Sequence, residues 1–163
     1  MKYKLPKVLV LDYEKWRCGG FWGQKDSSLG KGETRLLNYH GYMCCLGQFS
    51  EQCGIACDLL LYKETPIELK DITVPVLQSK SFVSNALAIN DGDLPILIKL
   101  KRLRNLCHRR GRKLHIKNLP FEYRTYFCGY DVFDNGVNDS ASASVGKYSG
   151  ESLEEFHKRI NND

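Results

Sequence analysis

The chain has 163 residues, 42% of them hydrophobic and 26% charged, which is typical of a single globular domain with a buried core. It contains no apolar run near the roughly 20 residues that a membrane-spanning helix needs, and its first residues become charged too early for a signal peptide. The composition therefore argues against a membrane partner and favours a cytoplasmic protein. The formal net charge of +5 is a modest excess, so the placement of the charges matters more than their number.

The first predicted element is a β-strand in KVLVLDYEKW, followed by one helical turn that Asp12 caps and that ends at a glycine pair. The glycine-rich stretch that follows, up to residue 33, predicts a loop. Its two large aromatic residues, Phe21 and Trp22, either pack on the core or contact a partner.

Helical periodicity dominates the middle of the chain. CCLGQFSEQCG predicts a helix with Cys45, Phe49 and Cys53 on its buried face and Gly54 as its stop. Further helices are predicted over 79–91, where the Asn-Asp-Gly sequence ends the helix, and over 94–111, where a glycine caps the C-terminus. Alternation and aromatic content predict strands over 112–118 and 122–133.

These elements predict an α+β fold, a single compact domain over residues 1–133 in which a small antiparallel sheet packs on several helices. Residues 134–150 are rich in Ser, Asn, Gly and Ala and predict a flexible linker or loop. Residues 151–163 predict a C-terminal helix, because apolar residues recur at helical spacing.

Short phrases in the chain resemble those of a known group of proteins. They are KWRCGG, LLNYHGYMCCLGQFSEQCGI and ALAIND, which precedes a helix and a strand. In this order they resemble small proteins of tailed bacteriophages and prophages that share a Met-Cys-Cys-Leu-Gly motif and carry no assigned activity. The resemblance covers roughly residues 10 to 118 and implies a phage protein in the cytoplasm of its bacterial host. It implies no site residues.

The cysteines raise the question of catalysis. The seven are Cys18, Cys44, Cys45, Cys53, Cys57, Cys107 and Cys128, an odd number in a chain without an export signal, which indicates reduced thiols. Cys44 or Cys45 at a helix N-terminus could be a nucleophile with His115 as its base, in a cysteine-dependent hydrolase or transferase. Buried packing is the favoured interpretation, because free cysteine behaves as a small hydrophobic residue.

No metal or cofactor is predicted. The chain has no Cys-x-x-Cys pair, and its His and Cys spacings are isolated. The sequence LGKGETR places a Gly-x-Gly beside Lys31 and Arg35 but lacks the spacing of a phosphate-binding loop, so we interpret it as a flexible turn.

The strongest functional signal is the segment KLKRLRNLCHRRGRK, in which no acidic residue can neutralise the cations. We expect the protein to be a phage accessory protein that binds a host protein or an anionic ligand, either a nucleotide or a nucleic acid, as an anti-defence or host-takeover inhibitor. The oligomeric state stays open. The expected binding residues are Lys99, Lys101, Arg102, Arg104, Arg109, Arg110, Arg112 and Lys113, with Phe21 and Trp22.

Overall fold

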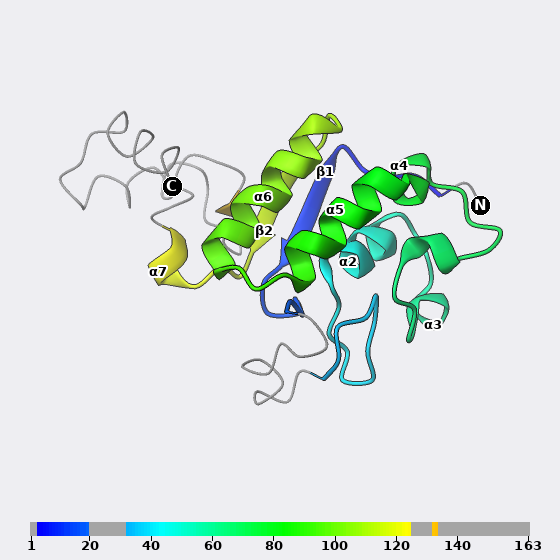
Figure 1. The fold of residues 1–163 in the computed structure, drawn as a ribbon, viewed down its shortest axis with the longest axis horizontal. Helices are drawn as coiled ribbons and strands as arrows, with labels where there is room; N and C mark the ends of the chain where they lie inside the picture. The colour runs from blue at the N-terminus through cyan, green and yellow to red at the C-terminus, as the bar shows by residue number, and fades with distance from the viewer. Residues whose placement is uncertain (1–2, 20–31, 125–131, 134–163) are drawn as a thin grey trace. The chain divides into compact units, whose positions relative to one another are not determined.

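The computed structural model describes residues 3–19, 32–124 and 132–133 (Figure 1). The chain divides into two units, and the boundary between them runs through two strands. The first unit comprises Met1–Leu11 and Lys15–Leu114, and the second comprises Asp12–Glu14 and His115–Asp163. The predicted linker, the predicted C-terminal helix and the pair Phe21 and Trp22 lie outside the described residues.

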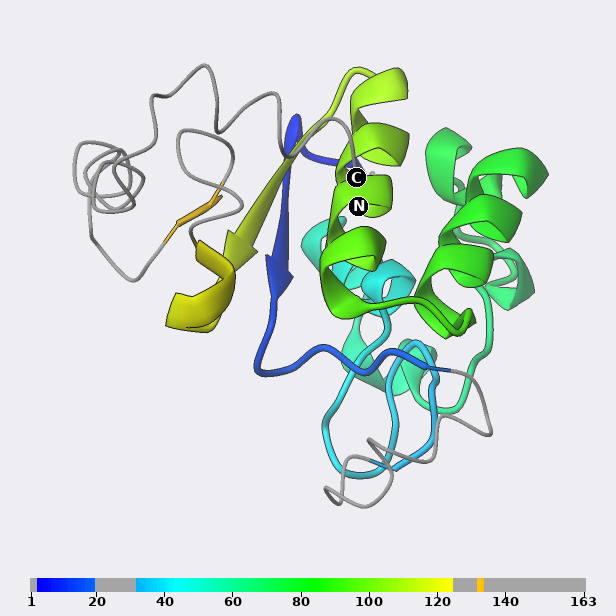
Figure 2. The same ribbon diagram turned by 60° about the vertical axis from the view of Figure 1, so that its left-hand side comes forward.

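The first unit is mainly helical, as Figure 2 shows. Three of its helices match the predicted ones: α2 (Cys45–Gln52), α5 (Lys80–Asp91) and α6 (Ile96–Arg109). Three shorter elements were not predicted: α3 (Cys57–Leu60), the 3-10 helix η1 (Pro66–Glu68) and α4 (Pro75–Gln78). Among the described residues, no helix is both long enough and apolar enough to cross a membrane.

Helix α2 lies in the core of the first unit. Cys45, Phe49 and Cys53 are buried, which confirms the predicted face, and Gly54 ends the helix with a φ of +91°. Gly47 lies in the first turn, where a Cβ atom would overlap the backbone of Leu36. The Cys-Cys-Leu-Gly sequence therefore combines buried thiols with a glycine that allows close approach of two backbone segments.

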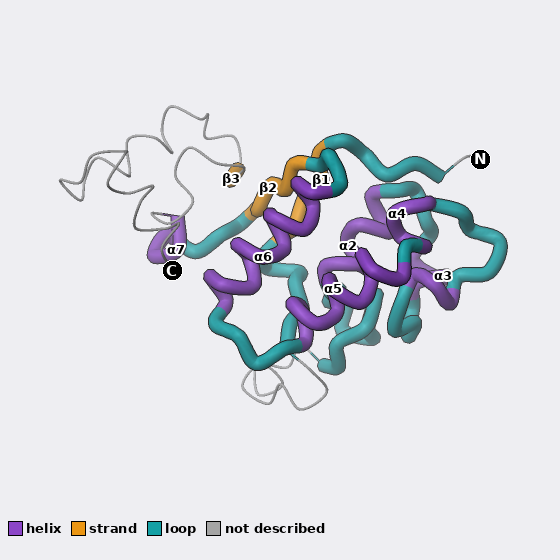
Figure 3. Tube along the Cα trace, turned by 45° about the horizontal axis from the view of Figure 1, so that its top comes forward, coloured by secondary structure: helices purple, strands orange, loops and turns teal. Residues whose placement is uncertain are grey.

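Helices α5 and α6 pack side by side and are joined by the short connection 92–95 (Figures 1 and 3). The N-cap of α5 is Ser79, whose hydroxyl accepts a hydrogen bond from the Phe82 amide. Apolar residues at helical spacing bury one side of each helix, and Gly111, with a φ of +66°, follows the end of α6. The buried apolar residues are Phe82, Val83 and Ala86 of α5 and Leu100, Leu103, Leu106 and Cys107 of α6.

The strands β1 (Val8–Asp12), β2 (Lys113–Lys117) and β3 (Val132–Phe133) form a sheet in the order β1-β2-β3. The predicted antiparallel sheet is wrong. β2 and β3 pair in parallel, with Ile116 opposite Val132. Parallel strands need long crossover connections that usually contain a helix, and helices do separate all three strands in the chain.

In the second unit, the chain after β2 forms a short helix, α7 (Phe121–Arg124). The predicted strand over 122–133 is therefore helical at its start, and β3 is its only described strand. The Asn118 amide donates to Asp12 Oδ1 at 2.9 Å, and the rings of Tyr13 and Tyr123 lie 6.2 Å apart. Both contacts tie the segment after β2 to residues 12–14.

Candidate functional site

Asn90, in the last turn of α5, is the buried centre of a hydrogen-bond network in the first unit. Its Oδ1 accepts from Trp16 Nε1 at 2.8 Å and from the Cys45 amide at 3.2 Å. Its Nδ2 donates to the carbonyl of Arg17 at 3.2 Å and to Asp91 Oδ1 at 2.9 Å. Each side-chain polar atom of Asn90 thus has two partners, as a buried amide requires.

The network joins three of the short phrases quoted in the sequence analysis. Trp16 belongs to KWRCGG, Cys45 to MCCLG and Asn90 to ALAIND. The sequence interpretation treated Asn90 only as part of a helix end. The signal it missed is the position of a polar residue on the apolar face of α5, because such a residue must find hydrogen-bond partners when it is buried.

Two cations are also buried near this network. Lys99 is 3% exposed, and its Nζ donates to the Asn90 carbonyl at 2.8 Å. Arg17 is buried and donates to the carbonyls of Cys18 and Gly32. Lys99 was expected on the binding surface, but its position and partner assign it to the core.

Burial disfavours the reactive thiolate forms of Cys44 and Cys45. Cys44 is the N-cap of α2, which confirms its predicted position at a helix start. Its Sγ accepts a hydrogen bond from the Gly47 amide at 3.4 Å. However, burial raises the pKa of Cys44 to about 12 and that of Cys45 well above the ordinary value. These thiols stay protonated near neutral pH, which favours packing over catalysis. The proposed base, His115, lies on β2 in the second unit.

A pocket of about 220 Å³ opens beside Cys44 in the first unit. It is lined by Thr34, Arg35, Cys44, Glu64, Thr65, Leu87 and Asp91. These residues come from the loop before α2, the segment before η1 and the helix α5. The pocket thus combines charged, hydroxyl, thiol and apolar groups that are distant in the sequence.

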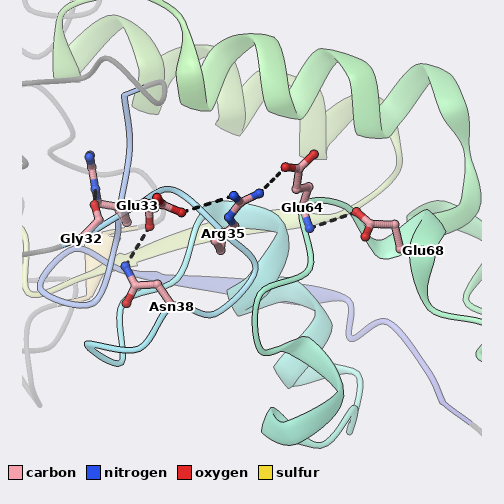
Figure 4. Close-up of polar contacts among 7 residues, drawn as sticks. Gly32, Glu33, Arg35, Asn38, Glu64 and Glu68 are labelled. Carbon is pink, nitrogen blue, oxygen red and sulfur yellow. Dashed lines mark hydrogen bonds and ion pairs between the residues drawn. The ribbon is translucent and has the colours of Figure 1, made fainter.

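Two charged groups of this pocket, Arg35 and Glu64, are held in place by their neighbours, as Figure 4 shows. The Arg35 guanidinium forms ion pairs with Glu64 and, at 3.2 Å, with Glu33, so that it lies between two carboxylates. The backbone of Glu64 is fixed in turn, because its amide donates to Glu68 Oε1 at 3.0 Å. Asp91 also lines the pocket, and burial raises its pKa, although the hydrogen bond from Asn90 and the charges of Lys99 and Arg17 oppose this shift.

The remaining predicted cations lie on α6 or in the four residues that follow it. Arg102, Arg109 and Arg110 are exposed, as is Lys113 at the start of β2. Lys101, Arg104 and Arg112 are half-buried. Arg110 donates to the hydroxyls of Ser79 and Ser81, which ties the end of α6 to the start of α5.

Some of these cations have no acidic partner in the described part of the chain. Within it, Arg102, Arg109 and Lys113 form no salt bridge, whereas Arg35 forms two. Arg102 and Arg109 are seven positions apart, so they lie on the same side of α6, two turns from each other. This exposed pair, with Lys113 nearby in sequence, is the basic surface referred to below.

No group of three or more metal-binding side chains comes together among the residues that the structure describes. Comparison with protein-family models, curated proteins and solved structures gave no significant match for the chain.

Proposed function

We propose that this is a binding protein rather than an enzyme, and that its basic surface holds an anionic partner, with nucleic acid as the favoured one. The observation that carries the proposal is the absence, within the described residues, of a salt bridge to Arg102 or Arg109 on the exposed side of α6. Exposed cations without neutralising acids raise the local concentration of anions. Arginine also matches the geometry of a phosphate group better than lysine does.

The rival proposal, a cysteine-dependent hydrolase or transferase, has weaker support. It requires Cys44 or Cys45 as a thiolate, but burial raises the pKa of both thiols. The phage resemblance fits the binding proposal, in which the protein works in the cytoplasm of an infected bacterium as an inhibitor of a host defence or regulatory system.

The proposal can be tested with a charge-matched pair of variants. The double variant Arg102→Glu/Arg109→Glu reverses the basic surface, whereas Lys15→Glu/Lys70→Glu reverses two exposed lysines elsewhere in the first unit. Both change the net charge equally. Binding of fluorescently labelled double-stranded DNA and RNA is measured by anisotropy over a series of salt concentrations.

We expect the arginine variant to bind at least about tenfold more weakly and to lower the slope of log K against log salt by about 2, because two phosphate contacts are lost. The lysine variant should retain most of the affinity. Equal losses in the two variants would mean that net charge alone drives binding, and no binding of the parent at low salt would exclude nucleic acid as the partner. Either result overturns the proposal.

A further inference from the structure

The pocket beside Cys44 uses none of the exposed cations of α6, so its chemistry is independent of the function proposed above. Its volume of about 220 Å³ is below the range of roughly 300–1,000 Å³ that is typical of sites for drug-sized ligands. An occupant would therefore be a small molecule. The charged and polar atoms left without partners indicate which chemistry it would need.

Asp91 has hydrogen-bonding capacity that the protein does not use. A carboxylate has about four acceptor positions. Asp91 accepts one hydrogen bond, from Asn90 Nδ2 to Oδ1, and no other forms to it among the described residues. Lys99 contributes its charge from nearby, but its Nζ donates to the Asn90 carbonyl instead. A ligand that donates hydrogen bonds would fill the open positions of this partly buried group.

Arg35 supplies the opposite requirement. Its guanidinium lines the pocket and carries only hydrogen-bond donors, so it favours an acceptor on the ligand. Its positive charge, however, is already balanced by Glu64 and Glu33. With Glu64 and Asp91 both lining the pocket, the formal charges of the lining side chains sum to −1, which favours a positively charged occupant.

We propose that this pocket binds a small primary amine that also carries a hydrogen-bond acceptor, such as an amino alcohol. The ammonium group donates to Asp91 and Glu64, the acceptor atom accepts a hydrogen bond from the Arg35 guanidinium, and the carbon atoms contact Leu87. An organic cation is favoured over a metal ion, because the described residues contain no group of three metal-binding side chains.

The test compares three ligands of similar size by isothermal titration calorimetry and by chemical-shift changes in amide spectra. Ethanolamine has the amine and the acceptor, ethylamine has only the amine, and ethylene glycol has no charge. We expect ethanolamine to bind more tightly than ethylamine, and ethylene glycol not to bind. Equal affinities for all three ligands, or no binding of ethanolamine at millimolar concentration, would overturn the proposal.

Variants locate the site. Asp91→Asn and Glu64→Gln should each weaken ethanolamine binding by about tenfold or more, because each removes a charge-assisted hydrogen bond. Glu33→Gln is the matched control, because Glu33 pairs with the same arginine but does not line the pocket. Leu87→Phe fills the pocket without a change of charge and should also weaken binding, which keeps the test decisive if Asp91→Asn folds poorly. An equal loss in Glu33→Gln, or unchanged binding in Leu87→Phe, would contradict the assignment.

Discussion

Lys99 and Arg102 lie one turn apart on α6, but their side chains are in opposite environments. Lys99 is 3% exposed and donates to a backbone carbonyl of α5, whereas Arg102 is exposed and forms no salt bridge within the described residues. The difference follows from the helical stripe. Lys99 lies next to the buried Leu100 and four positions before the buried Leu103, so it points toward α5. A basic segment can therefore supply one cation to the core and others to the surface.

The largest contrast between buried and exposed side chains should be seen in the reactivity of the thiols. Five of the described cysteines are buried and Cys57 is exposed. In a Cys128→Ser background, because Cys128 lies outside the described residues, a thiol reagent at mildly alkaline pH should label Cys57 first. The buried thiols should react orders of magnitude more slowly, since they must wait for local or global opening.

Mass spectrometry of the labelled peptides over time measures the difference in labelling rate between Cys57 and the buried thiols. Cys57→Ser should remove the rapid labelling. Rapid labelling of Cys44 or Cys45 in the folded protein would show an accessible thiol there and would revive the enzyme hypothesis.

The next largest effect should come from Asn90. Asn90→Ala removes the Asn90 hydrogen bonds to Trp16 Nε1, the Cys45 amide and the Arg17 carbonyl in the core. Since the loss of one buried hydrogen-bond partner costs about 1–3 kcal/mol, we expect the free energy of unfolding to fall by about 3–5 kcal/mol. Urea denaturation measures this free energy of unfolding. Asn105→Ala, at an exposed position of α6, is the control and should stay within about ±0.5 kcal/mol.

A smaller effect should separate the two cations of the opening comparison. Lys99→Met keeps the aliphatic volume but removes the charged donor near Asp91, so we expect a loss of about 1–3 kcal/mol in the free energy of unfolding near neutral pH. Arg102→Met should change it by no more than about 0.5 kcal/mol. Similar losses in the two variants, by urea denaturation, would show that the environments of the two residues differ less than their exposure indicates.

Local sequence patterns predicted the elements that local forces determine. The apolar spacing of α2, α5 and α6 and the alternation in β2 identified these elements to within a few residues. The short elements α3, η1 and α4 were missed, because a helix of three or four residues has little stability of its own and depends on packing. The strand direction was wrong, because β2 and β3 are separated in the chain by α7 and nothing local records that they pair in parallel.

The candidate sites also divide into features that local sequence patterns predict and features that only the tertiary fold creates. The exposed arginines of α6 follow from the amphipathic pattern, although that pattern did not reveal that Lys99 lies on the buried stripe. The pocket could not be predicted, because Arg35, Glu64 and Asp91 are brought together only by the tertiary fold. Asn90 is an intermediate case. The sequence shows that it lies on an apolar helix face, but it does not show which residues are its hydrogen-bond partners.

The smallest predicted effect concerns the pH dependence that Asp91 gives to stability. Burial raises the pKa of Asp91 above its ordinary value of 3.8. Below that value the carboxyl is protonated in both the folded and the unfolded chain. As the pH rises through 3.8 toward the folded pKa, the unfolded chain loses its proton first, so the contribution of Asp91 to stability falls and then becomes constant.

Asp91→Asn cannot titrate and should lack this fall. The difference in free energy of unfolding, variant minus parent, should therefore increase with pH across that window, by urea denaturation between about pH 3 and pH 7. Asp58→Asn, at an exposed position of α3, is the matched control. Because Lys99 lowers the pKa of Asp91, Lys99→Met should raise it further and extend the fall to higher pH, whereas Arg102→Met should not. If the pH profiles of the two variants coincided, Lys99 would not act on Asp91, and the contrast between the buried and the exposed cation would rest on packing alone.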